Sequence, residues 1–156
     1  MTCALWRIAA VTPTYSADDL SGKGAETTGG RWNLRGTPVV YTSANIALAS
    51  LETLGHLAAE RLPLNRYLVR IDVPDDVYAA RSVLAPAPAG WDADPYGMPS
   101  VQAGEAWCRA SRSALLEVPS VLVPEECNVL INPRHPDAAR IGAVMLRKWL
   151  VDPRVR

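Results

Sequence analysis

Short runs typical of β-strands alternate along this chain with two longer stretches typical of helices, and this mixture constrains the fold most. Residues 67–73 alternate Tyr, Val, Ile and Val with Leu, Arg and Asp, which predicts a strand with one apolar face. Residues 143–151 are apolar and fit either a strand or a helix. We therefore predict an α+β fold of short mixed strands with two main helices. The other expected elements are short strands at 5–9, 38–42, 120–123 and 128–131, and helices at 45–60 and 101–116.

The first expected helix carries two polar residues beside its apolar face. Glu52 and His56 are one turn apart and therefore neighbours on the helix surface. Gly55 beside them indicates close approach by another backbone or a ligand, or a tolerated defect. Ser43 is the expected N-cap. The positions expected to be buried are Ala47, Leu51, Leu54 and Ala58 here, and Trp107, Ala110, Ala114 and Leu115 around the second helix.

Length, charge and cysteine usage narrow the class of protein. The 156 residues fit a single domain, which we expect to span 1–156. The formal net charge is zero and no basic run occurs, so the clustered cations that bind nucleic acid are not indicated. No apolar stretch approaches the ~18 residues that cross a bilayer, and a secretory signal pattern is not recognised. Three widely spaced cysteines are most simply free thiols, so we expect a cytoplasmic protein without direct nucleic-acid or membrane binding.

Two polar, turn-rich stretches are expected to be loops, and the first contains a cation next to glycines. Residues 12–37 and 84–100 are these stretches. Long loops in a small domain are usually functional. Arg31 follows Gly29 and Gly30, which let a backbone approach a ligand closely, and a guanidinium suits phosphate. The alternative is an ordinary surface arginine after a turn.

Further candidate site residues are scattered along the chain. The carboxylate of Glu52 can stabilise positive charge in glycosidic-bond chemistry or hold a ribose hydroxyl, or it is simply solvated. His56 is a pocket wall, a general acid or base, or a structural histidine. Tyr41 either stacks on a flat heterocycle or fills the core. Ser120 lacks a Gly-x-Ser-x-Gly elbow, so a hydrogen bond to a ligand or to Glu52 is favoured over a nucleophile.

The amides of Asn128 and Asn132 flank a short apolar strand, where they either pin loops or contact a ligand. His135 is expected to order the turn that follows. Two histidines with a single Glu-x-x-x-His supply too few ligands for a metal. A Gly-x-Gly-x-x-Gly motif and a Walker A loop are both missing, which argues against the common nucleotide cradles. The polar set as a whole predicts a pocket for a polar, phosphorylated ligand.

These residues together resemble the RES family, which is named for an Arg, a Glu and a Ser. The resemblance implies the toxin half of a bacterial toxin–antitoxin pair, with a fold similar to ADP-ribosyltransferase toxins and NAD as substrate. It also implies a cognate Xre-like antitoxin whose C-terminal part covers the active site. The matching segments are 5–8 (LWRI), 30–33 (GRWN), 36–41 (GTPVVY), 51–56 (LETLGH), 118–120 (VPS) and 128–136 (NVLINPRHP).

The resemblance places the three name-giving residues at Arg31, Glu52 and Ser120. Arg31 would hold an NAD phosphate or the nicotinamide side, and Glu52 would stabilise the ribosyl cation as nicotinamide leaves. Ser120 would orient the substrate or Glu52. The pocket tyrosine of the family corresponds to Tyr41, which would stack on nicotinamide. Additional candidates are His56 in catalysis and Trp32 and Asn132 in NAD binding.

The leading functional hypothesis is therefore a growth-inhibiting toxin that consumes NAD, without a metal, and transfers ADP-ribose to a target protein. An alternative within the same chemistry is hydrolysis or phosphorolysis of NAD, with water or phosphate as acceptor. A third hypothesis is a non-catalytic module that binds a nucleotide or a partner protein. The carboxylate of Glu52 separates the two catalytic hypotheses from the binding module, because mere binding of an anionic dinucleotide gains nothing from a negative charge in the pocket.

Overall fold

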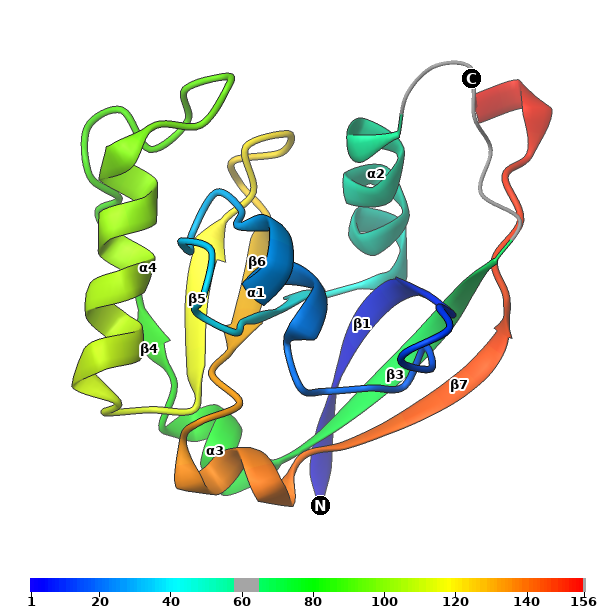
Figure 1. Ribbon diagram of the computed structural model, residues 1–156, viewed down its shortest axis with the longest axis horizontal. Coiled ribbons are helices and arrows are strands. Elements are labelled where there is room, and N and C mark those ends of the chain that lie inside the picture. The colour runs from blue at the N-terminus through cyan, green and yellow to red at the C-terminus, as the bar shows by residue number, and fades with distance from the viewer. Residues whose placement is uncertain (58–64, 156) are drawn as a thin grey trace.

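The computed structural model describes residues 1–57 and 65–155, and seven of its strands pair into one sheet (Figure 1). The strands are β1 (Thr2–Ala10), β2 (Val40–Ser43), β3 (Arg66–Pro74), β4 (Ser82–Val83), β5 (Leu115–Pro119), β6 (Cys127–Ile131) and β7 (Gly142–Lys148). Their order in the sheet is β4-β5-β6-β2-β1-β3-β7, with β4 and β5 parallel and the other pairs antiparallel. The helices are α1 (Lys23–Thr28), α2 (Ile46–His56), α3 (Asp75–Ala79) and α4 (Met98–Ala110), with short 3-10 helices at Pro136–Arg140 and Pro153–Val155.

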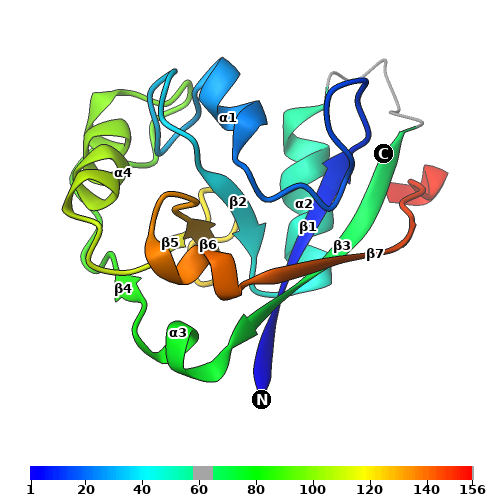
Figure 2. The same ribbon diagram turned by 60° about the horizontal axis from the view of Figure 1, so that its bottom comes forward.

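The predicted α+β fold is confirmed, with α2 and α4 as its main helices. Figures 1 and 2 show α4 beside the β4–β5 end of the sheet, while α2 packs on β1 and β2. The strand expected at 67–73 is β3, in which Val69, Ile71 and Val73 are buried at every second position. Residues 143–151 could not be assigned from the sequence, and they begin as strand β7.

Helix α2 differs from its prediction in both its cap and its buried face. Asn45 caps the helix by accepting a hydrogen bond from the Leu48 amide at 2.8 Å, whereas Ser43 ends strand β2. The buried residues are Leu48 and Ala49. Ala47 and Leu51 are exposed, so the prediction that they are buried is wrong, and Leu54 is only partly buried. The reason is that the helix turns its Leu48 side toward the sheet. The predicted end of this helix, 58–60 with Ala58, lies outside the described residues.

The second helix ends earlier than predicted. It stops at Ala110, which is exposed, and Ser111 adopts a left-handed conformation (φ 49°) that closes it. The apolar residues that follow form β5 at Leu115–Pro119, so the strand expected at 120–123 is wrong by several residues. The physical reason is pairing: this run is buried along β6, and that long-range contact decides between helix and strand.

The segment expected to be one loop at 12–37 contains the short helix α1, and α3 and β4 were not predicted. The loop after α1 packs closely on α4. A Cβ added to Gly104 of α4 would lie 1.8 Å from the carbonyl oxygen of Trp32, and Trp32 is itself buried beside Trp107. This contact fixes the residues that follow Gly30. No helix among the described residues is long and apolar enough to cross a membrane.

Candidate functional site

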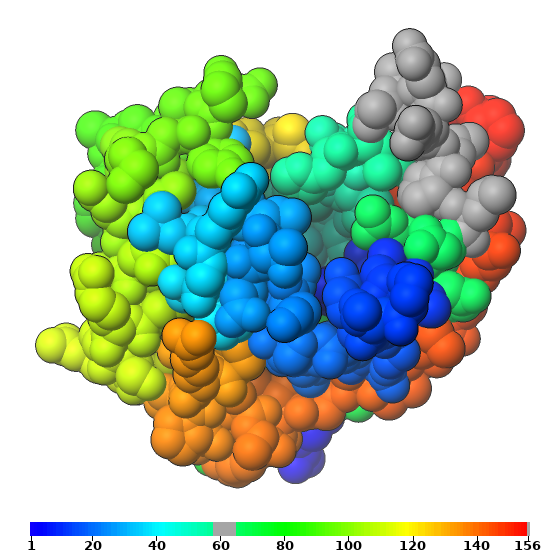
Figure 3. Space-filling view, in the orientation of Figure 1, coloured from blue at the N-terminus to red at the C-terminus, as the bar shows by residue number. Residues whose placement is uncertain are grey.

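The site lies where the sheet splits between β1 and β2. Within the described residues these two strands pair only at Trp6 and Ser43, and beyond this point a cavity of about 230 Å³ opens between them. A larger cavity of about 570 Å³ adjoins it beneath the segment around α1, where the surface is hollowed beside α2 (Figure 3). The larger volume is typical of a small-molecule site. The residues that line both cavities are Arg7, Tyr41, Glu52, His56, Arg66 and Asn128.

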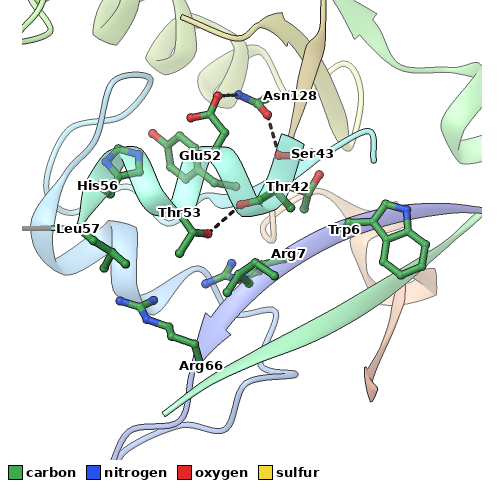
Figure 4. Close-up of a pocket in the computed structure, with 13 residues that line it drawn as sticks. Trp6, Arg7, Thr42, Ser43, Glu52, Thr53, His56, Leu57, Arg66 and Asn128 are labelled. Carbon is green, nitrogen blue, oxygen red and sulfur yellow. Dashed lines mark hydrogen bonds between the residues drawn. The ribbon is translucent and has the colours of Figure 1, made fainter. Parts of the chain in front are cut away.

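Glu52 on α2 is held at the wall of both cavities by two donors. Its Oε1 accepts a hydrogen bond from Ser120 Oγ at 2.6 Å. The same oxygen accepts another from Asn128 Nδ2 at 2.9 Å (Figure 4). Its other oxygen, Oε2, receives no hydrogen bond from the residues that the structure describes. The carboxylate is therefore fixed through one oxygen, and the second oxygen keeps its capacity to interact with a ligand.

Ser120 supports Glu52 from a buried position directly after β5. Its hydroxyl donates to Glu52 and accepts hydrogen bonds from the amides of Leu122 (3.2 Å) and Val123 (3.1 Å). Ser120 is fully buried and lines neither cavity. This arrangement suits the orientation of Glu52, which was one of the two roles expected for Ser120.

Arg31 lines the larger cavity, but part of its guanidinium is used to hold a loop. Its Nη1 donates to the carbonyl oxygens of Trp91 (2.9 Å) and Ala93 (2.8 Å). Its guanidinium also lies 5.9 Å from the ring centroid of Tyr96. Trp32 lines the same cavity and stacks on Trp91 with ring centroids 6.2 Å apart. These contacts hold the 84–97 loop against the cavity, and only the remaining nitrogens of Arg31 can contact a ligand.

The phenol of Tyr41 is anchored while its residue lines both cavities. Its hydroxyl donates to Asn33 Oδ1 at 2.6 Å and accepts from the Trp32 amide at 3.1 Å. Burial raises the pKa of Tyr41 well above its ordinary value of 10.0. A Cβ on Gly30 would lie 2.7 Å from this hydroxyl, so the glycine permits a close approach to Tyr41.

This anchoring predicts how Tyr41→Phe changes stability with pH. We expect the variant to lose about 1–3 kcal/mol at neutral pH, since Asn33 and the Trp32 amide lose a buried partner. In the unmodified protein, Tyr41 loses its phenolic proton at lower pH in the unfolded state than in the folded state. The free energy of unfolding therefore falls as pH rises above about 10. Tyr41→Phe should flatten this fall, as measured by denaturant unfolding between neutral and alkaline pH. A parallel pH dependence in the two proteins would contradict the burial of this phenol.

Of the remaining predicted site residues, His56 lines the cavities and Asn132 does not. His56, at the exposed end of α2, lines both cavities. Asn132 lies beyond β6 and lines neither cavity; its amide faces the Cys108 carbonyl at 3.4 Å and its side-chain oxygen accepts from the Arg134 amide at 3.0 Å. The structure therefore does not bring Asn132 to the site, because its side chain fixes the turn near the end of α4.

Two arginines of the site were missed from the sequence. Arg7 on β1 and Arg66 at the start of β3 line both cavities (Figure 4). Burial lowers the pKa of Arg7, and the nearby charge of Arg66 lowers it further, against partial compensation from Tyr15 and Asp19. Arg66 Nε is buried without a hydrogen-bond partner among the described residues. A signal was present, since Arg7 places a charge in the middle of an apolar strand.

In the part of the chain that the structure describes, no group of three or more His, Cys, Asp or Glu side chains could hold a metal ion. The cavities are lined by the carboxylates of Glu52 and Asp19, by cations that include Arg7 and Arg66, and by several aromatic side chains. A nearby anionic group would be attracted by the arginines, while Glu52 would favour a centre of developing positive charge.

The chain belongs to the RES domain family, which matches residues 4–152. It is 57% identical over 157 residues to the Prs ADP-ribosylating toxin of Sphingobium sp. (strain YBL2). This alignment covers 99% of this chain and 98% of that protein. It is also 36% identical to Toxin Res of Yersinia enterocolitica (97% of this chain, 99% of that protein). Toxin Res of Pseudomonas putida is 39% identical over 136 residues, or 86% of this chain and 87% of that protein. The family resemblance predicted from the sequence is confirmed.

Proposed function

We propose that this RES-domain protein is a toxin that cleaves the nicotinamide–ribose bond of NAD and transfers ADP-ribose to a target protein, which inhibits growth. The observation that carries the proposal is the Glu52 carboxylate, which two donors hold at the wall of the cavities. The name of the Sphingobium relative, an ADP-ribosylating toxin, supports the reaction type.

The chemistry proposed for the site requires stabilisation of positive charge. The bond between ribose C1′ and the nicotinamide nitrogen breaks, and its electron pair leaves with nicotinamide. Glu52 stabilises the positive charge that develops on the ribose. A nucleophilic atom of the acceptor then bonds to C1′ and gives up its proton to His56 or to the solvent. Tyr41 supplies an aromatic ring for the nicotinamide, with its hydroxyl already bound to Asn33. His56, which lines both cavities, would act as a second polar wall or as an acid or base near Glu52.

Arg7 and Arg66 support a dinucleotide as the ligand. No described carboxylate lies within ion-pair distance of either guanidinium, and partial burial of a cation without such a partner costs free energy. A pyrophosphate would offset this cost, since guanidinium groups bind phosphate oxygens through paired donors. We assign the phosphates to these two residues before Arg31, whose Nη1 is already bound to the loop carbonyls.

Removing either arginine should weaken NAD binding. We expect Arg7→Ala and Arg66→Ala to raise the Kd for NAD roughly 10- to 100-fold, as for the loss of a charge-assisted hydrogen bond. Lysine at either position should give intermediate affinity, because it keeps the charge but loses the paired donors. Calorimetric titration with NAD checks this, with Arg147→Ala on the exposed strand β7 as the matched control. Native affinity for NAD in both alanine variants would contradict the assignment of the phosphates to Arg7 and Arg66.

The same cavity also supports the alternative acceptors, water or phosphate, since cleavage of NAD needs the same carboxylate. A protein acceptor is favoured here because the Sphingobium relative is named for ADP-ribosylation. The partner that we propose to control the toxin is an Xre-like antitoxin that covers the active site. A non-catalytic binding module is disfavoured, because a fixed carboxylate would repel an anionic dinucleotide without any benefit to binding.

NAD labelled in its adenylate part distinguishes these acceptors. The purified protein is incubated with the labelled NAD, with and without cell lysate. We expect the label to become fixed to a protein of the lysate in a native reaction but not in a reaction with Glu52→Gln. Free ADP-ribose or its phosphorylated form as the only product would instead identify water or phosphate as acceptor. If folded native protein, free of antitoxin, leaves NAD intact both with and without lysate, the proposed chemistry is overturned.

A further inference from the structure

Asn128 on β6 joins the Glu52 carboxylate to strand β2 through a chain of polar side chains. The Ser43 hydroxyl donates to Asn128 Oδ1 at 2.8 Å, and Asn128 Nδ2 donates to Glu52 Oε1 at 2.9 Å (Figure 4). Ser43 and Asn128 are direct partners across the β2–β6 ladder. An ionised carboxylate only accepts hydrogen bonds, so Glu52 takes the donor end of the Asn128 amide, and the Ser43 hydroxyl donates to the acceptor end.

We propose that Asn128 is a positioning residue for Glu52, and that Ser43 anchors the other end of its amide. The inference rests on the proposed role of Glu52 as the carboxylate that stabilises the ribosyl cation. Ser120 donates to the same oxygen from the end of β5, so two donors from different strands hold Oε1. The carboxylate cannot rotate away without losing both hydrogen bonds, and Oε2 keeps a fixed direction.

Sheet packing alone does not account for an asparagine at this position. Asparagine is disfavoured in strands, and the next residues of β6, Val129 to Ile131, are apolar and buried. Asn128 instead lines both cavities. Ser43 is 4% exposed, and a buried hydroxyl needs a partner, which Asn128 provides. The pair thus places a polar side chain in a strand, where its amide reaches Glu52.

Kinetics of NAD cleavage separate positioning from a general loss of structure. We expect Asn128→Ala to lower kcat roughly 10- to 100-fold, the equivalent of one hydrogen bond to a charged group, with KM changed only a few-fold. Ser43→Ala should lower kcat in the same sense, whereas Ser43→Thr, which keeps the hydroxyl, should restore it. Equal effects of Ser43→Ala and Ser43→Thr, or a loss confined to KM, would overturn the assignment.

The Asn128→Asp variant adds a pH signature that depends on direct contact between position 128 and Glu52. At high pH its carboxylate repels Glu52, since neither group can donate. As pH falls, the two carboxylates share one proton, and a donor between them is restored. The activity of Asn128→Asp relative to the native protein should therefore rise as pH falls toward about 5, before both groups take up protons. A ratio that stays constant with pH would contradict the positioning role.

A readout without turnover distinguishes failure of this inference from failure of the proposed function. In the ¹H–¹⁵N spectrum of the ligand-free protein, the Asn128 side-chain amide should shift in Glu52→Gln and in Ser43→Ala, but remain near its native position in Ser43→Thr. If the amide responds in this way and the native protein leaves NAD intact, the proposed function fails and the positioning contact stands. If the amide is insensitive to both Glu52→Gln and Ser43→Ala, the inference is overturned whatever happens to NAD.

Discussion

Replacing Glu52 by glutamine is expected to lower the rate of NAD cleavage on the order of 1,000-fold, the scale associated with losing an electrostatic contact to a transition state. The amide side chain introduced by this change keeps an oxygen that can accept from Ser120 and Asn128. The fold should therefore be retained. NAD affinity should stay within a few-fold of native or improve, because a negative charge leaves a pocket for an anionic ligand. Single-turnover cleavage and calorimetric binding measure the two quantities separately.

The matched control is Glu117→Gln. Glu117 on β5 pairs with Arg81 at 3.1 Å and lines neither cavity, so the same chemical change should leave cleavage near native. Growth of cells that express each variant gives an independent check. Growth inhibition should disappear with Glu52→Gln and persist with Glu117→Gln. A Glu52→Gln protein that cleaves NAD at the native rate would remove this carboxylate from the reaction.

The second large effect concerns stability and comes from Gly104 on α4. A Cβ there would lie 1.8 Å from the Trp32 carbonyl oxygen and 2.7 Å from its carbonyl carbon, so backbone must move. We expect Gly104→Ala to lower the free energy of unfolding by about 3 kcal/mol, through overpacking. For a domain of this size the midpoint of thermal unfolding should fall by roughly 6–12 °C. Thermal and denaturant unfolding provide the measurement.

The loop that Gly104 supports also carries Arg31, so the variant should affect the cavity. Glu105, the next residue on α4, accepts hydrogen bonds from the Leu34 amide (3.0 Å) and the Thr37 hydroxyl (2.9 Å). Displacing α4 would disturb these contacts as well. Gly142→Ala is the control, because a Cβ at that position meets nothing within 4 Å. Equal stability of the Gly104→Ala and Gly142→Ala proteins would contradict the close packing of α4 on Trp32.

Local patterns in the sequence were sufficient for some elements but not for others. The alternation in β3 identified that strand, because Val69, Ile71 and Val73 share one side of a half-buried strand. The run that begins at Leu115 has no such signature. It fits the end of a helix equally well, and only its pairing with β6 makes it a strand. The end of α4 before Ser111 could therefore not be predicted without knowing that the following residues pair with β6.

The candidate site shows the same limit. Glu52 and Ser120 are 68 positions apart, so spacing could not show their contact; a hydrogen bond between them was one of two alternatives left open, and the family resemblance grouped them in one site. Asn128 and Asn132 flank the same strand, but four residues of extended chain separate them by about 13 Å. One amide therefore reaches Glu52 while the other lies near Cys108. Arg66 could not be assigned, because its role depends on the split between β1 and β2.

Release of nicotinamide from NAD by the purified native protein, followed by proton NMR, tests the proposed chemistry most directly. Its resonances are distinct from those of NAD, so the measurement needs no acceptor to be known. We predict that nicotinamide accumulates with the native protein in the presence of lysate as acceptor, and that Glu52→Gln releases it at a rate lower by a factor on the order of 1,000. Intact NAD in the presence of folded, NAD-binding native protein, or equal release by Glu52→Gln, would contradict cleavage driven by the Glu52 carboxylate.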